Sequence, residues 1–332
     1  MKTFIRFFAC CLLPTACCFF SSCSNDTTQD DTTHSTTDNN KSSLPPAPKF
    51  NEDSAYAFVK AQVDFGPRVP GTTSHAKCAE YLVSKLKSFG WKTQIQNGNI
   101  TTYDGKKFNL KNIIASYKPE ITHRILLLSH WDSRPFADSA TIDSDKPFDS
   151  ADDGPSGVGV ILEIARQLRI AQPNVGIDIL FDDLEDYGKE NDHNSWALGT
   201  QYWAKNPHTP AYKAQYGILL DMVGAKGATF PREGLSRESA PHIVKKIWNK
   251  ASRLNYSNYF VFDDIHGITD DHAYIISEAN IPCVDIVNWD FNTGNFAYYH
   301  HRHSDNMTII DKNTLKAVGQ TVLEVLWEEQ KH

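Results

Sequence analysis

The segment 177–188, with the sequence IDILFDDLEDYG, most constrains how this chain can fold. Its first five residues form a short apolar run, which predicts a strand buried on both faces, as in a parallel sheet. Glu185 and Asp186 follow, at the carboxyl end of that strand, where open α/β sheets bind their ligands. In a metal site, one acid of such a pair can bind the ion while its neighbour moves protons. An acidic pair alone is also typical of a solvated turn.

Apolar strand-like runs and amphipathic helical patterns alternate along most of the chain. Strands are predicted at 93–96, 112–116, 124–129, 177–181, 216–220 and 281–287. Helices are predicted at 53–62, 74–89, 157–168, 195–205, 240–254, 272–279 and 313–327. This alternation predicts a single α/β domain, with a mostly parallel mixed central sheet that is flanked by helices on both faces.

The first 49 residues differ in composition from the rest of the chain. A basic start, an apolar run over 7–20 and small residues before Cys23 predict a signal peptide at 1–22. The apolar run is shorter than the roughly 20 residues that a membrane span needs. Residues 23–49 are rich in Ser, Thr, Asp and Asn, so we expect a disordered polar tether there and a folded catalytic domain at 50–332.

The charge and the cysteines narrow the classes of protein further. The formal net charge is −7, and an acidic chain argues against binding to nucleic acid, which needs a basic surface. Only Cys78 and Cys283 lie in the predicted domain. Two buried thiols are the more common arrangement for such a pair, and a disulfide between them stays open.

Residue types that bind metals follow one predicted strand after another. They are His130 and Asp132, Asp152 and Asp153, Glu185 and Asp186, Asp221, and the group His300, His301, His303 and Asp305. Because the carboxyl ends of parallel strands meet at one edge of a sheet, we expect these side chains to converge. Carboxylates and imidazoles together are typical of a zinc site.

In order and spacing, these motifs resemble the zinc aminopeptidase fold. The motifs are His130-x-Asp132, Asp153-Gly-x-Ser-Gly157, Glu185-Asp186-x-Gly188, Asp221-Met-Val-Gly224 and His301-x-x-x-Asp305. Four further stretches are similar to bacterial glutaminyl cyclases of the animal type: FGPRVP at 65–70, HWDSR at 130–134, WALGTQYW at 196–203 and DDH at 270–272. The resemblance covers the chain from about residue 50 to the C-terminus.

The resemblance implies a ligand set and a reaction. Asp153, Asp186 and His301 would bind one Zn²⁺ and leave a fourth position open for the substrate. The γ-carboxamide of an N-terminal glutamine would bind there and be polarised. Glu185 would carry a proton from the attacking α-amine to the departing ammonia as pyroglutamate forms.

The resemblance also implies supporting roles. Asp271, with Asp221 beside it, would form a hydrogen bond with the amide nitrogen of the substrate and help Glu185 keep its proton. The candidate substrate-binding residues are Trp196, Trp289, Phe291 and His300. His130 would either bind a second metal or form hydrogen bonds inside a one-metal site.

Three positions depart from the family's pattern: Leu184 in place of Gly, Asp186 in place of the Glu of many relatives, and His300 in place of the Trp of the animal enzymes. The neighbouring histidines also make the choice of the imidazole ligand ambiguous. The four-residue spacing to Asp305 favours His301. His303 is then expected to be a neighbour of the site or a surface residue.

The sequence therefore predicts a zinc-dependent glutaminyl-peptide cyclotransferase that acts on peptides and proteins with an N-terminal glutamine. Two alternatives stay open: a zinc metallo-aminopeptidase with one or two metals, and a non-catalytic surface lipoprotein. Cys23 resembles the lipidated cysteine of bacterial lipoproteins. This resemblance implies export to the bacterial cell envelope, at the periplasm or the outer-membrane surface, with a lipid anchor as the only membrane contact. A monomer is the expected state.

Overall fold

A computed structural model describes residues 44–331, and the fold is that of this unit. The predicted signal peptide at 1–22, the lipidation of Cys23 and the tether up to residue 43 lie outside the described residues. Within 44–331, no helix has the length and hydropathy that a bilayer crossing needs.

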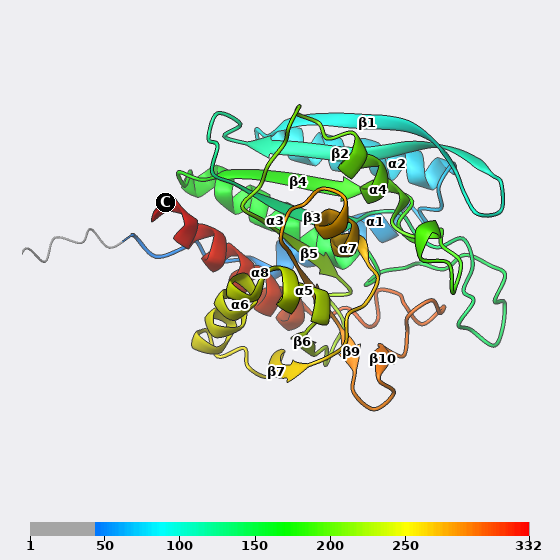
Figure 1. Cartoon of the computed structure of the whole chain (residues 1–332). Coiled ribbons are helices and arrows are strands. Elements are labelled where there is room, and N and C mark those ends of the chain that lie inside the picture. Colours follow the sequence, from blue (N-terminus) through cyan, green and yellow to red (C-terminus); the bar gives the residue numbers. More distant parts are fainter. Residues whose placement is uncertain (1–43, 332) are drawn as a thin grey trace, which may run out of the picture. The chain divides into compact units, whose positions relative to one another are not determined.

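Six strands form the central sheet in the order β1-β2-β4-β3-β5-β8 (Figure 1). Their bounds are Lys92–Thr101 for β1, Lys107–Tyr117 for β2, Arg124–His130 for β3, Gly176–Asp182 for β4, Tyr216–Asp221 for β5 and Cys283–Val287 for β8. β4, β3, β5 and β8 pair in parallel, whereas β1 and β2 are antiparallel at one side. The predicted mixed, mostly parallel sheet is confirmed.

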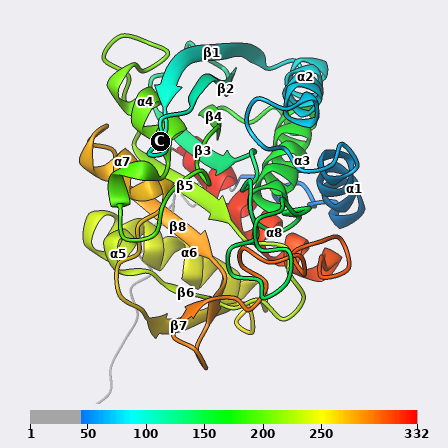
Figure 2. The same cartoon turned by 90° about the vertical axis from the view of Figure 1, so that its right-hand side faces the viewer.

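Helices cover both faces of this sheet. They are α1 (Glu52–Val63), α2 (Thr73–Ser88), α3 (Pro155–Ala171), α4 (Leu198–Lys205), α5 (Gly234–Ser239), α6 (Pro241–Arg253), α7 (Asp271–Ser277) and α8 (Lys312–Glu328). Figure 2 shows α4 and α7 on one side of the strands and α1, α2 and α3 on the other. Alternate residues of β3 follow this division: Leu127 joins the larger apolar core, and Leu126 and Leu128 join the smaller one. Such burial on both faces explains the continuous apolar strand sequences.

Several short elements were not predicted. They are β6 (Phe230–Arg232), β7 (Phe260–Asp264), β9 (Trp289–Asp290), β10 (Asn295–Phe296), α5 and the 3₁₀ helices at His193–Ser195 and Glu329–Lys331. The helix predicted at 195–205 begins only at Leu198, because Ala197 has a left-handed backbone with φ of 51°. Elements this short carry too little periodicity to be read from sequence.

The last residues of the predicted tether belong to the described unit. Trp327 Nε1 donates a hydrogen bond to the Pro45 carbonyl at 2.7 Å, and Gln320 Nε2 donates to the Pro48 carbonyl at 3.2 Å. Both donors lie on α8. These two hydrogen bonds hold residues 44–49 beside α8. Proline can take part in them because it lacks an N–H but keeps a carbonyl that accepts.

Cys78 and Cys283 are buried free thiols. Cys78 belongs to the larger apolar core and Cys283 to the smaller one, on opposite faces of the sheet. Burial in apolar surroundings raises the pKa of the Cys78 thiol to about 12. These thiols thus pack as small apolar side chains.

Candidate active site

The three predicted metal ligands converge at the carboxyl edge of the sheet. Asp153 lies in the connection between β3 and α3, Asp186 follows β4, and His301 follows β10. His301 Nε2 is 3.1 Å from Asp186 Oδ1 and 3.9 Å from Asp153 Oδ2. All three residues are buried, so a metal ion that binds here loses most of its hydration water.

Polar atoms of this cluster are left without hydrogen-bond partners among the described residues. Asp186 Oδ2 has none, and the ring nitrogens of His130 and Asp221 Oδ1 lie near charged neighbours without a well-aligned hydrogen bond. Buried polar atoms without partners cost stability, and a divalent cation would satisfy them. The donor set of carboxylate oxygens and imidazole nitrogens fits Zn²⁺. The site can therefore hold the metal that the sequence predicts.

Two overlapping groups of side chains could hold an ion. The ligand atoms of Asp153, His300 and His301 lie within 4.8 Å of one another, and so do those of His130, Asp153 and Asp221. The first group includes His300, which the sequence placed with the substrate-binding residues. Because Asp153 belongs to both groups, the positions of the side chains are compatible with one metal or with two.

His130 is surrounded by carboxylates. Its Nε2 is 2.9 Å from Asp153 Oδ1 and 3.3 Å from Asp221 Oδ1, and its Nδ1 is 3.6 Å from Asp132 Oδ1. Burial alone would lower the pKa of His130, but these three carboxylates outweigh burial and hold the pKa well above its ordinary value. Asp132 also accepts a hydrogen bond from the Glu185 backbone N–H at 3.2 Å, which ties the first motif to the acid pair.

Glu185 lies next to the ligands and is half-buried. Desolvation raises the pKa of its carboxyl well above the ordinary value, the carboxylates of Asp271 and Asp186 raise it further, and His130 opposes them. A carboxyl whose pKa is raised in this way can both accept and return a proton. Glu185 is therefore the proton carrier that this geometry favours.

The neighbouring acids Asp270 and Asp271 at the start of α7 face different groups. Burial raises the pKa of Asp271 to about 6, and Asp182 and Thr200 lie beside its carboxyl and oppose this rise. Burial, with the nearby Asp221 carboxylate, raises the pKa of Asp270 to about 7. The sequence had assigned a role to Asp271 and Asp221. Asp270 is thus a further acid near the candidate site. From the sequence alone, one cannot tell which of these two adjacent acids faces Asp221.

Trp196 forms one wall of the site. Its ring is stacked on the His301 ring with a centroid distance of 6.0 Å. A Cβ at Gly188 would come within 1.9 Å of the Trp196 ring. Only glycine therefore leaves room for this ring beside the acid pair.

A chain of aromatic rings leads away from His301. The His300 ring lies 3.6 Å from the His301 ring and 4.6 Å from the Phe296 ring, and Phe296 contacts Trp289 at 5.8 Å. Phe296 was not predicted as a site residue. The predicted Phe291 is 48 % exposed, at the turn that joins β9 to β10. The structure thus places Trp196 and His300 against His301, links Trp289 to them only through Phe296, and leaves Phe291 on the surface.

Three residues with a left-handed backbone lie beside the candidate site residues. Leu184, Met222 and His301 have φ values of 60°, 49° and 55°, in the left-handed region that residues with a Cβ rarely adopt. They lie just before Glu185, just after Asp221 and at the imidazole ligand itself. Such strain persists where the surrounding structure determines the conformation, as at catalytic sites.

Asp305 fixes the loop that carries Asp153. Its carboxylate accepts hydrogen bonds from the backbone N–H groups of Ala151 at 3.1 Å, Asp152 at 2.8 Å and Asp153 at 3.2 Å. The sequence flagged Asp305 only by its spacing from His301. Its hydrogen-bond partners are more than 150 residues away in the sequence, so the local sequence does not predict these contacts.

His303 points away from the ligands. It is exposed, and its Nε2 lies 3.1 Å from the backbone carbonyl of Asp143.

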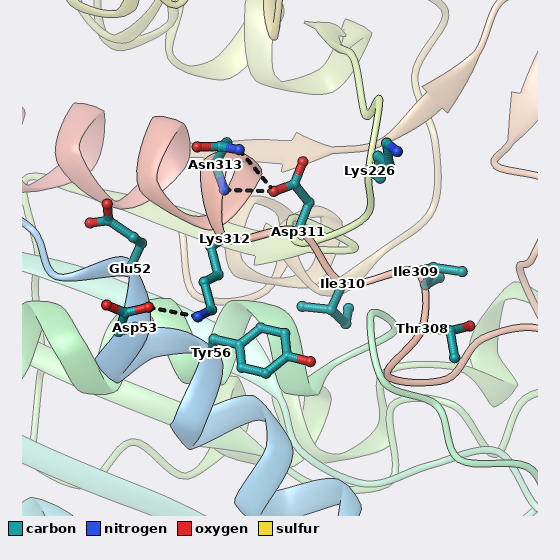
Figure 3. Close-up of a pocket in the computed structure, with 10 residues that line it drawn as sticks. All are labelled: Glu52, Asp53, Tyr56, Lys226, Thr308, Ile309, Ile310, Asp311, Lys312 and Asn313. Carbon is teal, nitrogen blue, oxygen red and sulfur yellow. Dashed lines mark hydrogen bonds and ion pairs between the residues drawn. The ribbon is translucent and has the colours of Figure 1, made fainter.

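A surface hollow of about 680 Å³ lies elsewhere on the molecule (Figure 3). Its walls come from the start of α1, from Lys226 and from residues 308–313. Lys312 Nζ is 2.7 Å from Asp53 Oδ1 across the rim. The lining contains none of the predicted ligands or acids, so this hollow is separate from the candidate active site.

An α/β sheet that gathers buried carboxylates and imidazoles at its carboxyl edge has the features of a metal-dependent enzyme. The model of Peptidase family M28 matches residues 112–326, and the chain belongs to this family.

Within this class the chain is similar to glutaminyl cyclases. The crystal structure of Porphyromonas gingivalis glutaminyl cyclase has a TM-score of 0.84 and 50 % sequence identity, over 85 % of this chain and 100 % of that chain. A Zn-dependent exopeptidase from Parabacteroides distasonis has a TM-score of 0.83 and 52 % identity, over 85 % and 99 % of the two chains. Glutaminyl-peptide cyclotransferase of Drosophila melanogaster is 22 % identical over 271 residues, 75 % of this chain and 73 % of that protein. The resemblance predicted from the motifs is confirmed.

Proposed function

We propose that the protein is a zinc-dependent glutaminyl-peptide cyclotransferase, which converts the N-terminal glutamine of peptides and proteins to pyroglutamate. The observation that carries this proposal is Glu185, a carboxyl of raised pKa that lies beside three converging ligands. The 50 % identity with Porphyromonas gingivalis glutaminyl cyclase over the whole of that chain supports the same conclusion.

In the proposed reaction, one group of residues binds the metal and another residue transfers the proton. Asp153, Asp186 and His301 hold one zinc ion, which supplies polarisation of the γ-carboxamide of the substrate. Glu185 accepts a proton from the α-amine as the new nitrogen–carbon bond forms. The same carboxyl then gives this proton to the departing amide nitrogen, which leaves as ammonia. The proton count balances, and the site activates no water.

The acids behind Glu185 keep its proton available. Close carboxylates raise one another's pKa, and Asp270, Asp271 and Asp221 have raised pKa values of about 7, about 6 and about 6, with burial as the main cause. Trp196 covers the side of the site next to His301, so it limits the access of water to the bound glutamine.

A metallo-aminopeptidase is the second candidate function. His130, Asp153 and Asp221 could hold a second ion, and Glu185 would then activate a water molecule. The similar Zn-dependent exopeptidase from Parabacteroides distasonis favours the same alternative. One zinc per chain distinguishes the proposed cyclase from this two-metal arrangement.

The mass of the product separates the two functions. A short peptide that begins with glutamine is incubated with the protein, with and without a chelator, beside a control peptide that begins with leucine. The proposal expects a chelator-sensitive loss of one ammonia from the first peptide and no change in the second. Removal of the whole first residue would establish an aminopeptidase, and two unchanged peptides would contradict both functions.

We also propose that the protein is exported and anchored by a lipid on Cys23. The basic start, the apolar run and the small residues before Cys23 support this location at the bacterial cell envelope. Substitution Cys23→Ala should release the protein from the membrane fraction. If Cys23→Ala leaves the membrane association unchanged, the anchor is not a lipid at this residue. We propose that the catalytic unit acts as a monomer, which size-exclusion chromatography with light scattering would test.

A further inference from the structure

Asp138 lies behind His301, on the side away from the other ligands. It belongs to the connection between β3 and α3, which also carries Asp153. Its Oδ1 is 3.4 Å from His301 Nδ1. The other ring nitrogen, Nε2, is 3.1 Å from Asp186 Oδ1. The two nitrogens of one ring therefore face two carboxylates, one inside the ligand cluster and one outside it.

Arg134 fixes the Asp138 carboxylate by a two-pronged ion pair. Its Nε donates to Asp138 Oδ1 at 2.8 Å and its Nη2 donates to Oδ2 at 2.5 Å. The Arg134 side chain is only 2 % exposed, whereas that of Asp138 is 43 % exposed. A planar guanidinium that binds both oxygens sets the direction of a carboxylate more strictly than a lysine would.

The same guanidinium also contacts the backbone of a second ligand. Its Nη1 donates to the carbonyl of Asp186 at 2.9 Å and to that of Gly188 at 3.2 Å. The rings of Phe136 and Trp196 lie 4.5 Å and 4.8 Å from the guanidinium. These rings and carbonyls hold the Arg134 guanidinium in place. Because the guanidinium binds both oxygens of Asp138, it also fixes the position of that carboxylate.

The backbone joins the same two segments. Ser139 N–H donates to the His301 carbonyl at 3.2 Å, and His301 has the strained φ of 55°. Asp138 and its neighbour therefore contact both the side chain and the main chain of His301. A purely surface role for Asp138 would need neither contact.

We infer that Asp138 is a positioning residue for the metal ligand His301. Its carboxylate accepts a hydrogen bond from the Nδ1–H group and so selects the tautomer in which Nε2 is free to bind zinc. Histidine ligands generally donate their second N–H to a carboxylate, a carbonyl or a water, and loss of this partner weakens metal binding. The inference rests on the proposed ligand set of Asp153, Asp186 and His301.

The test measures zinc affinity in the full chain, by competition with a chromogenic chelator. Asp138→Ala removes the acceptor and should weaken zinc binding by about 10- to 100-fold. Asp138→Asn keeps an acceptor oxygen and should weaken it less. The matched control is Asp143→Asn, an exposed acid of the same loop that pairs with Lys146 at 2.8 Å, and this variant should bind zinc as the unchanged protein does.

A second readout separates positioning from general loss of structure. In the cobalt-loaded protein, Asp138→Ala should change the absorption spectrum of the metal, while the circular dichroism spectrum of the metal-free protein should match that of Asp143→Asn. Unchanged zinc affinity in Asp138→Ala would overturn the inference, and so would an unchanged cobalt spectrum. His301→Ala should lose the metal; tight binding in that variant would overturn the ligand set. An unchanged protein that binds no zinc would overturn the proposed function as well.

Discussion

The two ends of the central sheet both bury charged side chains, but the hydrogen bonds of these side chains are complete at only one end. At the amino end, Arg124 binds both oxygens of Asp178, at 2.6 Å and 2.7 Å. Ser116 and Tyr212 donate further hydrogen bonds to Asp178. At the carboxyl end, Asp186 Oδ2 has no hydrogen-bond partner among the described residues, and His130 and Asp221 pair without a well-aligned hydrogen bond.

This difference separates a stabilising ion pair from a binding site. A buried ion pair is tolerated when each charge is paired and hydrogen-bonded, as at Arg124 and Asp178. Unpaired buried polar groups cost stability, and they persist where a ligand completes them or where chemistry needs them. The comparison assigns structure to the amino end and catalysis to the carboxyl end.

The largest expected effect is on turnover at the carboxyl end. Glu185→Gln keeps the shape of the side chain but removes the proton carrier, so pyroglutamate formation should fall by about 10²- to 10⁴-fold. Zinc content should stay unchanged, because Glu185 is not a ligand in the proposed set. Glu190→Gln, at an exposed acid of the same loop, is the control. Loss of zinc in Glu185→Gln would show that the roles of Glu185 and Asp186 are reversed.

At the amino end, the same kind of substitution should change stability and leave the chemistry intact. Asp178→Asn leaves the Arg124 guanidinium buried without its counter-charge, which costs about 3–5 kcal/mol of the free energy of unfolding. Denaturant unfolding measures this loss, and zinc affinity of the folded protein should not change. A loss of zinc affinity with unaltered stability would break the comparison between the two ends.

The fold was largely predictable because its strands are buried on both faces. The apolar run at 177–181 predicted β4 almost to the residue. The short β6 and β7 were not predicted, because they depend on tertiary packing such as that of the Phe230 ring on the Phe260 ring at 5.3 Å. A three-residue strand has no periodicity of its own.

The convergence of the candidate ligands could be predicted, but the residues that contact them could not. Asp153, Asp186 and His301 lie in motifs whose order carries the signal, and the structure brings them together. Asp138 and Asp270 act through contacts between loops far apart in the sequence. Nothing in the local sequence distinguishes Asp138 from the other acids of the loop between β3 and α3.

A smaller effect concerns the stability of the metal-free protein at different pH values. The pKa values of Asp270, Asp271 and Asp221, raised by burial to about 7, about 6 and about 6, exceed those of an unfolded chain. The folded state therefore binds more protons than the unfolded state in this range, and the metal-free protein should become more stable as the pH falls from about 7 to about 5. Thermal unfolding across this range checks the sign. Stability that rises with pH in the metal-free protein would contradict the account, whereas zinc-loaded protein should lose metal and stability in acid.

The smallest expected effect is at His303. This exposed ring contacts the Asp143 carbonyl, away from the ligands, so His303→Ala should leave zinc affinity and turnover unchanged. Measured beside His301→Ala, it sharpens the contrast between a buried ligand and its surface neighbour. Metal loss in His303→Ala alone would move the imidazole ligand two positions along the chain.

The number of zinc ions per chain tests the central claim most directly. The claim is that Asp153, Asp186 and His301 at the carboxyl edge form one metal site beside a separate proton carrier, Glu185. Elemental analysis of the full chain, after loading with excess zinc and dialysis against zinc-free buffer, should find one tightly bound zinc per chain, with a higher unfolding temperature than the metal-free protein. Two tightly bound ions would contradict the cyclase account in favour of the peptidase arrangement. No bound zinc would contradict the metal site itself.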